Sequence, residues 1–339
     1  MKTKNKTSLK DLNSFRVDCF SSNFNIINNE KEIIDFLVSN KEPDSIILGG
    51  GTNTLFKNNI DKPILKIQIK GIEVINESNN SILISVGAGE VWDDLVNWCL
   101  TNNYGGLENL SLIPGNVGSA PIQNIGAYGV ELKDVFKSCR AISIETGSLR
   151  IFKNIQCNFS YRSSIFKEEL KNKYIITNVI FKLSKNNHVI DYSYEPLKND
   201  LKNNNILNPT INDISKSVIN IRSSKLPDPK LIGNCGSFFK NPVVDNIKYK
   251  KLKKKEDNIP YYKMSKNKVK IPAAWLIESC GFKGLRDGNT GTYDKHALII
   301  VNHGKASGLE IFNFSQKIKN KVLKKFNILL EEEVNIIDN

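Results

Sequence analysis

The chain has 339 residues, of which 40% are hydrophobic and 24% charged, and its formal net charge is +13. This length exceeds what one hydrophobic core ordinarily supports, so we expect a folded protein of two or three lobes. The polar, lysine-rich residues 1–12 and the absence of an apolar run near the roughly 20 residues that cross a bilayer favour a cytoplasmic protein.

The predicted elements begin with a helix at residues 32–38, followed by a short buried strand at 45–49 that ends in glycines. Further strands are predicted at 64–69, 82–86, 141–144, 174–183 and 297–301, and further helices at 91–102, 212–223, 273–279 and 308–325. Because strands and helices are interspersed, the predicted class is α+β. The polar, Asn-rich segment 198–212 is the expected hinge and main boundary.

Two glycine-rich loops lie in the N-terminal half. Segment 49–56 (GGGTNTLF) can turn several backbone N–H groups toward one point, which suits a pyrophosphate but is also compatible with a structural turn. It has neither the Gly-x-Gly-x-x-Gly order of a Rossmann fingerprint nor the Lys-Ser/Thr ending of a P-loop. Segment 112–129 (LIPGNVGSAPIQNIGAYG) is long and uncharged, and such a loop in a compact domain is usually functional. We expect it to accept a flat, polar ring system and its phosphates.

The segment 233–242 (GNCGSFFKNP) places Ser237 between a glycine and two aromatic residues, with Lys225 a short distance upstream. A hydroxyl held near cationic side chains and walled by rings can give a proton to a strongly basic centre. These ten residues alone favour a Gly-Ser turn leading into a buried aromatic pair, and the rest of the chain reverses that preference.

Metal chemistry is not expected. The six cysteines form no Cys-x-x-Cys pair, and the three histidines form no His-x-x-x-His or His-Glu arrangement. We interpret the cysteines as free, mostly buried thiols.

The positive charge is concentrated in Lys- and Asn-rich patches such as 248–255 (KYKKLKKK) and 198–205. Clustered basic residues can indicate nucleic-acid binding. The accompanying Ile and Asn favour compositional drift toward A+T-rich codons, with solvated lysines. A field that attracts phosphorylated small molecules stays open as an alternative.

The two glycine loops, segment 161–167 (YRSSIFK), segments 225–230 (KLPDPK) and 236–242 (GSFFKNP), and segment 331–334 (EEEV) together resemble the UDP-N-acetylenolpyruvoylglucosamine reductase family. The resemblance extends from about residue 13 to 337, with the motifs in the family's order. Segment 248–264 and Tyr194-Glu195-Pro196-Leu197 favour the longer of its two subtypes.

The resemblance implies an FAD-binding domain of two α+β lobes, similar to vanillyl-alcohol oxidases, and a C-terminal α+β substrate-binding domain. The implied lobes are residues 13–70 and 71–205, the implied substrate domain is 215–326, and segment 327–339 would return to the active site. It further implies non-covalent FAD, NADPH as co-substrate, and reduction of UDP-N-acetylglucosamine enolpyruvate to UDP-N-acetylmuramate for peptidoglycan synthesis. A flavin suits this reaction because it can accept hydride from one partner and release it to another. We expect a monomer without nucleic-acid or membrane partners.

By the same resemblance, Ser237 is the proton donor, and Arg162 and Glu333 hold and polarise the carboxylate region of the substrate, the three meeting at a lobe interface. A carboxylate beside developing negative charge must be protonated or offset by the arginine, and both possibilities stay open. The implied cofactor-binding residues are Gly49, Gly50, Gly51, Thr52, Asn53, Pro114, Gly115, Gly118, Ser119, Gln123, Asn124, Gly126 and Ala127. The implied substrate-binding residues are Tyr194, Lys225, Asn241, Tyr262 and His296.

Two positions depart from the family pattern. His296 stands where similar members carry glutamine, and it adds a possible charge near pH 6.5. Cys235 stands where a smaller residue is usual and would make the site sensitive to thiol oxidants.

Two rival hypotheses come from other directions. An FAD-linked oxidase with the same cofactor fold would use oxygen and give Ser237 no role. A basic nucleic-acid-binding protein, or a non-catalytic remnant, would show salt-sensitive oligonucleotide binding without a yellow colour.

Overall fold

The computed structural model describes residues 2–4, 6–39 and 44–339, and the chain forms two compact units, each built from separate segments. Unit 1 comprises Met1–Lys6, Ser22–Gly50 and Lys62–Ser224. Unit 2 comprises Thr7–Ser21, Gly51–Asp61 and Lys225–Asn339. Two short N-terminal segments, 7–21 and 51–61, therefore join the C-terminal half, although most of their residues were expected in the N-terminal lobe 13–70.

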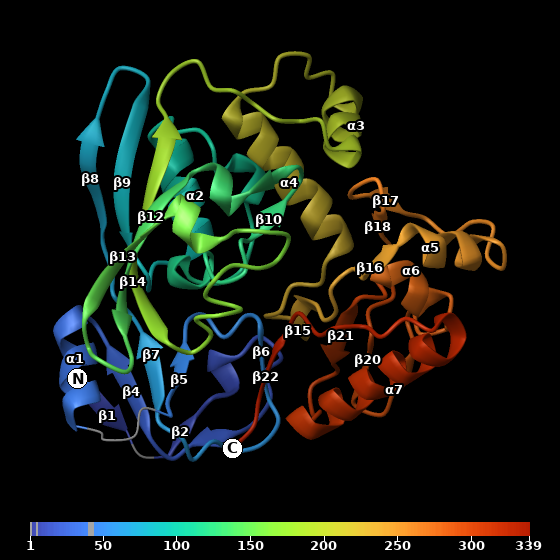
Figure 1. Ribbon diagram of the computed structural model, residues 1–339, viewed down its shortest axis with the longest axis horizontal. Helices are drawn as coiled ribbons and strands as arrows, with labels where there is room; N and C mark the ends of the chain where they lie inside the picture. The colour runs from blue at the N-terminus through green and yellow to red at the C-terminus, as the bar shows by residue number, and fades with distance from the viewer. Residues whose placement is uncertain (1, 5, 40–43) are drawn as a thin grey trace. The chain divides into compact units, whose positions relative to one another are not determined.

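The centre of unit 1 is a five-stranded antiparallel sheet in the order β13-β12-β14-β9-β8 (Figure 1). Its strands are β8 (Ile72–Glu77), β9 (Ser81–Gly87), β12 (Phe136–Ser143), β13 (Leu149–Lys153) and β14 (Tyr174–Ser184). Helix α2 (Trp92–Thr101) packs on it through its apolar face, and the Trp92 ring meets Phe181 edge-on at 6.0 Å. Strands β9 and β14 and helix α2 lie where they were predicted, and β12 overlaps the strand predicted at 141–144. Strands β8 and β13 were not predicted.

A four-stranded sheet in the order β1-β4-β7-β5 carries the first glycine loop. It consists of β1 (Lys2–Lys4), β4 (Phe24–Ile27), β5 (Ile46–Leu48) and β7 (Ile64–Ile67), with α1 (Glu30–Ser39) beside β4. The expectation that β5 is a buried strand was wrong in part, since only Leu48 is buried. The reason is its place at the edge of this sheet, which sequence alone does not reveal.

The expected hinge at 198–212 contains ordered structure instead. Helix α3 (Glu195–Asn203) occupies its first part, and α4 (Ile211–Lys225) begins at its end. Leu197 and Leu201 of α3 pack against Ile214 and Val218 of α4. Their apolar spacing gives a buried core to a segment whose polar composition indicated a linker. The two units divide after Ser224.

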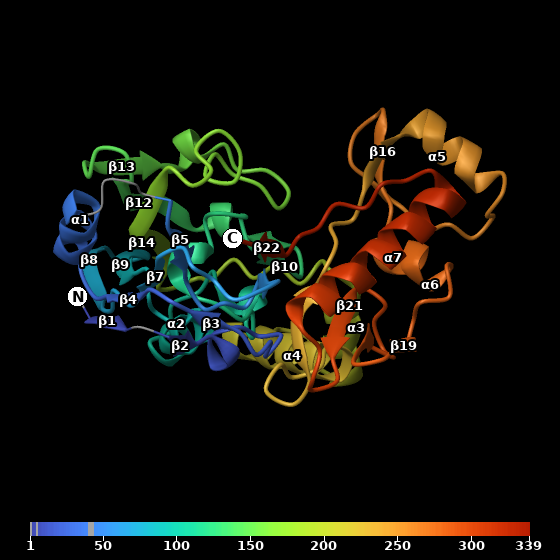
Figure 2. The same cartoon turned by 90° about the horizontal axis from the view of Figure 1, so that it is seen from below.

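Unit 2 is built on the antiparallel sheet β15-β21-β20-β19, with α7 (Gly308–Phe326) packed against β20 and β21 (Figure 2). Its strands are β15 (Gly233–Ser237), β19 (Arg286–Asp287), β20 (Thr290–Thr292) and β21 (Ile299–Asn302). Ser307 and Glu310 form a capping box at the start of α7, satisfying N–H groups that the first turn leaves unpaired. Helix α6 (Ala273–Glu278) packs beside α7.

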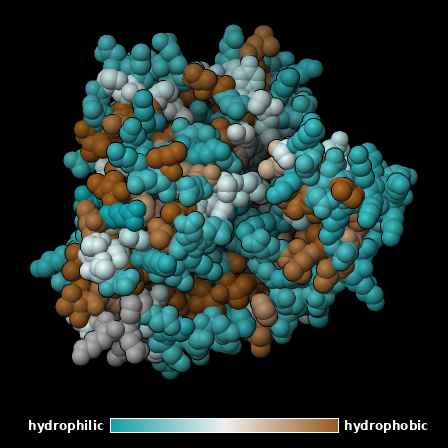
Figure 3. Space-filling view, viewed as in Figure 1, coloured by the Kyte–Doolittle hydropathy of each residue, from teal (hydrophilic) through white to brown (hydrophobic). Residues whose placement is uncertain are grey.

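A smaller sheet in the order β16-β18-β17 belongs to the same unit, with β16 (Val243–Asp245), β17 (Tyr262–Lys263) and β18 (Lys268–Lys270). Helix α5 (Asn246–Lys253) follows β16 and carries part of the lysine patch. Lys250, Lys251 and Lys253 are exposed, and hydrophilic side chains cover this end of the unit in Figure 3.

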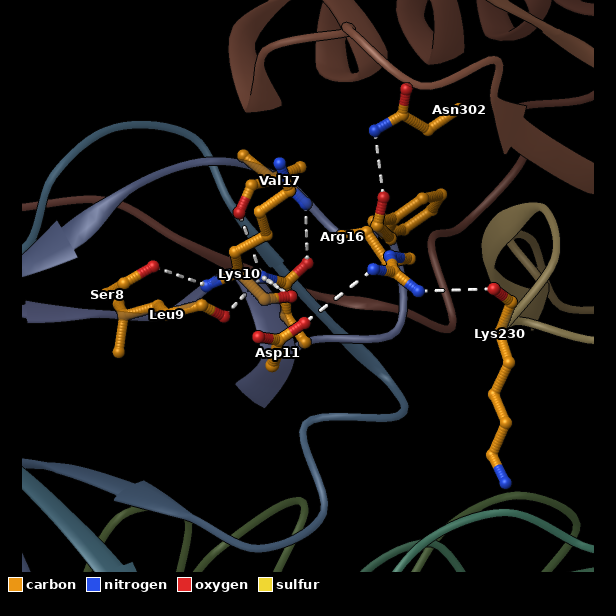
Figure 4. A network of polar contacts seen from close by, with 10 residues as sticks. Ser8, Leu9, Lys10, Asp11, Arg16, Val17, Lys230 and Asn302 are labelled. Carbon is orange, nitrogen blue, oxygen red and sulfur yellow. Dashed lines mark hydrogen bonds and ion pairs between the residues drawn. The ribbon is translucent and has the colours of Figure 1, made fainter.

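Segment 7–21 is tied to the C-terminal half by polar contacts (Figure 4). The Arg16 guanidinium donates to the carbonyl oxygen of Lys230 at 3.1 Å, and the Asn302 amide donates to the carbonyl oxygen of Phe15 at 2.8 Å. Strands β2 (Thr7–Ser8) and β3 (Phe20–Ser21) form a ribbon within this segment. Segment 51–61 joins the unit through β6 (Thr54–Phe56), which pairs in parallel with β22 (Asn335–Ile337) near the chain end.

The remaining regular structure is short. It comprises strands β10 (Gly126–Ala127) and β11 (Val130–Glu131), and the 3-10 turns Lys10–Leu12, Glu108–Leu110, Val117–Ser119, Leu132–Asp134 and Asn154–Cys157. Within the described residues, no helix combines the length and apolar character needed to cross a bilayer.

Candidate active site

The first glycine turn lies against the second glycine loop in unit 1. A Cβ placed on Gly50 would lie 2.8 Å from Oδ1 of Asn116 and 3.0 Å from the Cα of Gly115. At Gly49 the closest atoms would be 3.8 Å away. The two loops therefore meet backbone to backbone at Gly50, where a side chain has no room.

The second loop is held in place by the connection between β9 and α2. The Asn116 amide donates to the carbonyl oxygen of Gly89 at 2.6 Å, and the N–H of Gly118 donates to the carbonyl oxygen of Ala88 at 2.9 Å. A Cβ on Gly118 would lie 2.5 Å from the Cβ of Ala88, so packing requires a glycine there. Ser119 closes a turn by donating its hydroxyl to the carbonyl oxygen of Asn116.

One cation lies beside the first turn. Lys66 on β7 donates from Nζ to the carbonyl oxygen of Gly49. Burial, assisted by the charge of Lys70, lowers the pKa of Lys66 to about 8. Sequence reasoning missed Lys66, because its neighbour Gly49 lies 17 positions away and on another strand.

The side chain of Asn124 is buried and makes its hydrogen bonds to neighbouring protein groups. Its amide donates to Glu131 at 3.0 Å and to the carbonyl oxygen of Ser160 at 3.1 Å, and its Oδ1 accepts from the N–H of Lys133 at 3.1 Å. These bonds hold the loop against the β10–β11 ribbon. Of the other expected cofactor residues here, Pro114 is exposed, Gln123 is half-buried, and Ala127 packs against the sheet's core.

Arg162 lies beside the same ribbon. A Cβ on Gly126 would lie 3.4 Å from Nη1 of Arg162. Arg162 adopts a left-handed backbone conformation (φ 54°) in a tight turn closed by mutual backbone bonds between Ser160 and Ser163. Such a conformation is uncommon for residues other than glycine, and it is often found at functional sites.

A second arginine, Arg222 on α4, belongs to this neighbourhood and was missed by sequence reasoning. Burial lowers its pKa, opposed by a hydrogen bond and charge interaction with Tyr128, and the charge of Arg162 lowers it further. Tyr128 meets the exposed Tyr194 edge-on at 5.5 Å. The sequence feature that could have indicated Arg222 is its position three residues before Lys225, the first residue of segment 225–230.

In unit 2, Ser237 is exposed at the end of β15, opposite Ile299 of β21. Gly236 before it has φ 68°, which a glycine adopts without strain. Phe238 and Phe239 after it are buried and pack edge to face at 5.1 Å. The strand thus presents the hydroxyl while the rings anchor the backbone.

The expected oxidant sensitivity of Cys235 is contradicted by the structure. Its side chain is buried beside the carbonyl oxygen of Thr54, and burial raises the pKa of Cys235 to about 12. A thiol reacts as the thiolate, so this cysteine is a packing residue.

The chain end brings Glu333 next to the serine motif. The N–H of Glu333 donates to the carbonyl oxygen of Phe238 at 2.8 Å. Phe239 and Glu332 form an isolated antiparallel β-bridge. Glu331 pairs with Lys240, and Glu332 receives two 2.9 Å bonds from Lys319. Burial opposes ionisation of Glu332, but the bonds from Lys319 and Gln316 outweigh it and lower the pKa. The segment is therefore anchored and is not a solvated acidic tail.

Residues 51–53 of the first glycine loop also lie in unit 2. A Cβ on Gly51 would lie 1.9 Å from the carbonyl oxygen of Leu12, so a glycine is required there. Asn53 donates from Nδ2 to the carbonyl oxygen of Glu333 at 3.0 Å. Thr52, between them, is half-buried.

Four expected substrate residues lie in unit 2. His296 is half-buried, and burial lowers its pKa, with further lowering by the charges of Lys225 and Lys283. The expected charge near pH 6.5 is thus corrected to one that forms only at lower pH. Asn241 accepts the N–H of Ala273 at the start of α6, at 2.9 Å. Tyr262 is exposed on β17, with the Lys270 ammonium 5.4 Å from its ring centroid.

Residues 228–337 match the family model described as UDP-N-acetylenolpyruvoylglucosamine reductase, C-terminal domain, and residues 27–152 match an FAD binding domain. A protein of Flavobacterium johnsoniae named UDP-N-acetylenolpyruvoylglucosamine reductase is 47% identical over 99% of this chain and all of its own length. The chain belongs to the UDP-N-acetylenolpyruvoylglucosamine reductase family.

Other members of this reductase family agree with the assignment. A relative of the same name from Amoebophilus asiaticus is 42% identical, with 97% of each chain covered. The crystal structure of the reductase from Thermus caldophilus is 20% identical, covers both chains completely and has a TM-score of 0.70, which supports the fold. The predicted α+β class and the predicted FAD-binding domain are thereby confirmed.

The geometry of the reductase fits the FAD that its N-terminal match implies. The contact between Gly50 and Asn116 brings the backbones of the two glycine loops together without an intervening side chain, and backbone N–H groups of such loops suit a pyrophosphate. Among the described residues, no cluster of three or more His, Cys, Asp or Glu side chains could hold a metal ion.

Proposed function

We propose that the protein catalyses the NADPH-dependent reduction of UDP-N-acetylglucosamine enolpyruvate to UDP-N-acetylmuramate in peptidoglycan precursor synthesis. The relatives, similar along almost the whole chain, support the reaction. The observation that carries the assignment of roles is the bond between Glu333 and Phe238, which brings two distant motifs to adjacent positions beside Ser237.

We assign residues 13–70 and 71–205 to FAD binding, although segments 13–21 and 51–61 fold with unit 2, and we assign 215–326 with 327–339 to the substrate. The two family models, at 27–152 and 228–337, support this division of labour. Bound FAD would supply the hydride chemistry that links NADPH to the alkene of the enolpyruvyl group. The residues that would hold it, several through backbone groups, are 49–52, 114–115, 118–119, 123–124 and 126–127.

Ser237 supplies the proton. Hydride addition leaves an enolate-like charge on the neighbouring carbon, and that carbon is basic enough to take a proton from an oriented hydroxyl. The exposed position of Ser237 on an anchored strand supports this role. The alkoxide that remains is then reprotonated from solvent.

Arg162 binds the substrate carboxylate and stabilises the developing charge, as a planar guanidinium does for two oxygens at once. Glu333 acts with it in holding and polarising this region. The remainder of the substrate is bound by five residues: Tyr194, Lys225, Asn241, Tyr262 and His296. Lysine and tyrosine side chains suit its anionic diphosphate. Lys225 lies close enough to lower the pKa of His296, which supports a shared role.

We further propose that the enzyme is a cytoplasmic monomer, acting on small molecules without a nucleic-acid or membrane partner. Sedimentation of the purified protein, with and without oligonucleotide, tests this statement.

The test of the reaction is the absorbance of the purified protein between roughly 300 and 550 nm, where oxidised flavins absorb. We expect NADPH to bleach the flavin anaerobically and the enolpyruvate substrate to restore it. In Ser237→Ala, NADPH should still bleach the flavin, but the recovery of its absorbance on addition of substrate should be largely lost. Ser39→Ala, on α1, should behave as wild type. A protein that cannot be reconstituted with FAD would refute the proposal, and recovery by oxygen alone would indicate an oxidase.

A further inference from the structure

Asn53 belongs to the first glycine loop, and its neighbours are glycines and a threonine suited to a cofactor. Its side chain nevertheless turns to the other end of the chain. Nδ2 of Asn53 donates to the carbonyl oxygen of Glu333, 280 positions away, at 3.0 Å. An amide hydrogen used in this bond is directed at the protein backbone.

The backbone of Asn53 takes part in the same contact. Its carbonyl oxygen accepts the N–H of Asn335 at 3.0 Å and the side-chain amide of Asn335 at 3.1 Å. The parallel pairing of β6 with β22 starts at the next residue, where Thr54 faces Asn335. Residues 53–56 therefore form a continuous seam with the chain end.

Glu333 is consequently held on both sides of its backbone. Its N–H donates to Phe238, the residue after Ser237, and its C=O accepts from Asn53. These two bonds fix where the Cα–Cβ bond of Glu333 points, because both peptide planes flanking its Cα are constrained. The intervening loop is anchored too, since the carbonyl oxygen of Gly51 accepts the N–H of Ser14 at 3.1 Å.

We propose that Asn53 is a positioning residue for Glu333, joining the cofactor-binding glycine loop to the carboxylate that acts on the substrate. This inference rests on the proposed function, in which Glu333 polarises the substrate. It changes the role of Asn53 from a ligand of FAD to a support of the second half-reaction. Small displacements of a reacting group can lower a rate by about 100-fold.

The test measures the two half-reactions separately by rapid mixing under anaerobic conditions. We expect Asn53→Ala to keep its FAD and its rate of bleaching by NADPH, and to lose at least about tenfold in the rate of flavin recovery by substrate. Asn335→Ala is the matched control, because it removes a bond to the backbone of Asn53 without touching Glu333. It should leave both rates unchanged.

A double-mutant cycle shows whether Asn53 acts through Glu333. We expect Asn53→Ala to slow recovery much less in a Glu333→Gln background than in wild type. If the two substitutions slow flavin recovery independently, so that their effects multiply in the double variant, the proposal is overturned. Loss of FAD from Asn53→Ala, or equal slowing of both half-reactions in it, would also overturn the proposal. A wild-type protein that does not reduce the substrate would refute the proposed function, whereas a normal Asn53→Ala in an active enzyme would refute only this inference.

Asn53→Asp provides a second variant should the alanine variant not fold. It keeps the shape of the side chain but removes the donor while ionised. Recovery should then be slow at neutral pH and should improve relative to wild type as the new carboxyl is protonated at lower pH. A variant as fast as wild type at neutral pH would overturn the proposal.

Discussion

Gly50 and Asn116 lie so close that a Cβ on the glycine would stand 2.8 Å from Oδ1 of the asparagine. The asparagine cannot easily yield, because its amide is held by Gly89 at 2.6 Å. The backbones of the two glycine loops therefore approach each other only with a glycine at position 50, and this contact shapes the surface proposed to bind FAD.

Gly50→Ala should weaken FAD binding. The added methyl group forces the loops apart, and overpacking of this kind costs about 1–3 kcal/mol. Titration of the apoprotein with FAD, followed by flavin fluorescence, measures the effect. Gly49→Ala is the matched control, because its Cβ would meet ordinary contacts at 3.8 Å and its affinity should change little. Equal losses in both variants would contradict this account.

Lys66→Met should change the pH dependence of stability. The folded protein has the pKa of Lys66 lowered by burial to about 8, against 10.5 ordinarily. Between these values the unfolded chain binds the proton more tightly, so wild-type stability should rise with pH across this window relative to the variant. Urea unfolding of both apoproteins measures the difference, with Lys182→Met removing an exposed lysine as control. A difference that stays constant with pH would refute the prediction.

His296→Gln should lose less than about tenfold in kcat/KM at neutral pH, because one neutral hydrogen-bonding group replaces another. The pKa of His296 is lowered by burial from 6.5, so the unfolded state takes up the proton first as pH falls. Wild type should therefore lose stability relative to the variant below pH 6.5 and not above it. Activity and thermal unfolding across this range measure both effects. A loss of activity in the variant that grows as pH falls below 6.5 would show that the imidazole acts as a cation.

Cys235 should resist alkylation in the native protein. It is buried with its pKa raised to about 12, whereas Cys280 is partly exposed. Peptide mass spectrometry after iodoacetamide treatment should find Cys280 modified first and Cys235 modified only after unfolding. Rapid native labelling of Cys235 with loss of activity would restore the oxidant-sensitive interpretation.

Several elements could be predicted because their signals are local. The helix predicted at 308–325 spans Gly308–Phe326, where the Ser307–Glu310 capping box and apolar spacing act within a few residues. The strand predicted at 174–183 spans Tyr174–Ser184 for the same reason. The partial burial of β5 and the helix within 198–212 were not predicted, since both depend on which elements pack beside them.

The candidate site, like the fold, has features that the sequence could predict and features that depend on tertiary packing. The order and spacing of its motifs identified the family, the cofactor and the chemistry, because particular residue types at particular positions are needed for them. Tertiary structure alone decided that Asn53 contacts Glu333, that Lys66 lies under Gly49, and that Cys235 and His296 have shifted pKa values. Pairings across as many as 280 residues leave no local pattern, and desolvation depends on the side chains that surround a group in the folded chain.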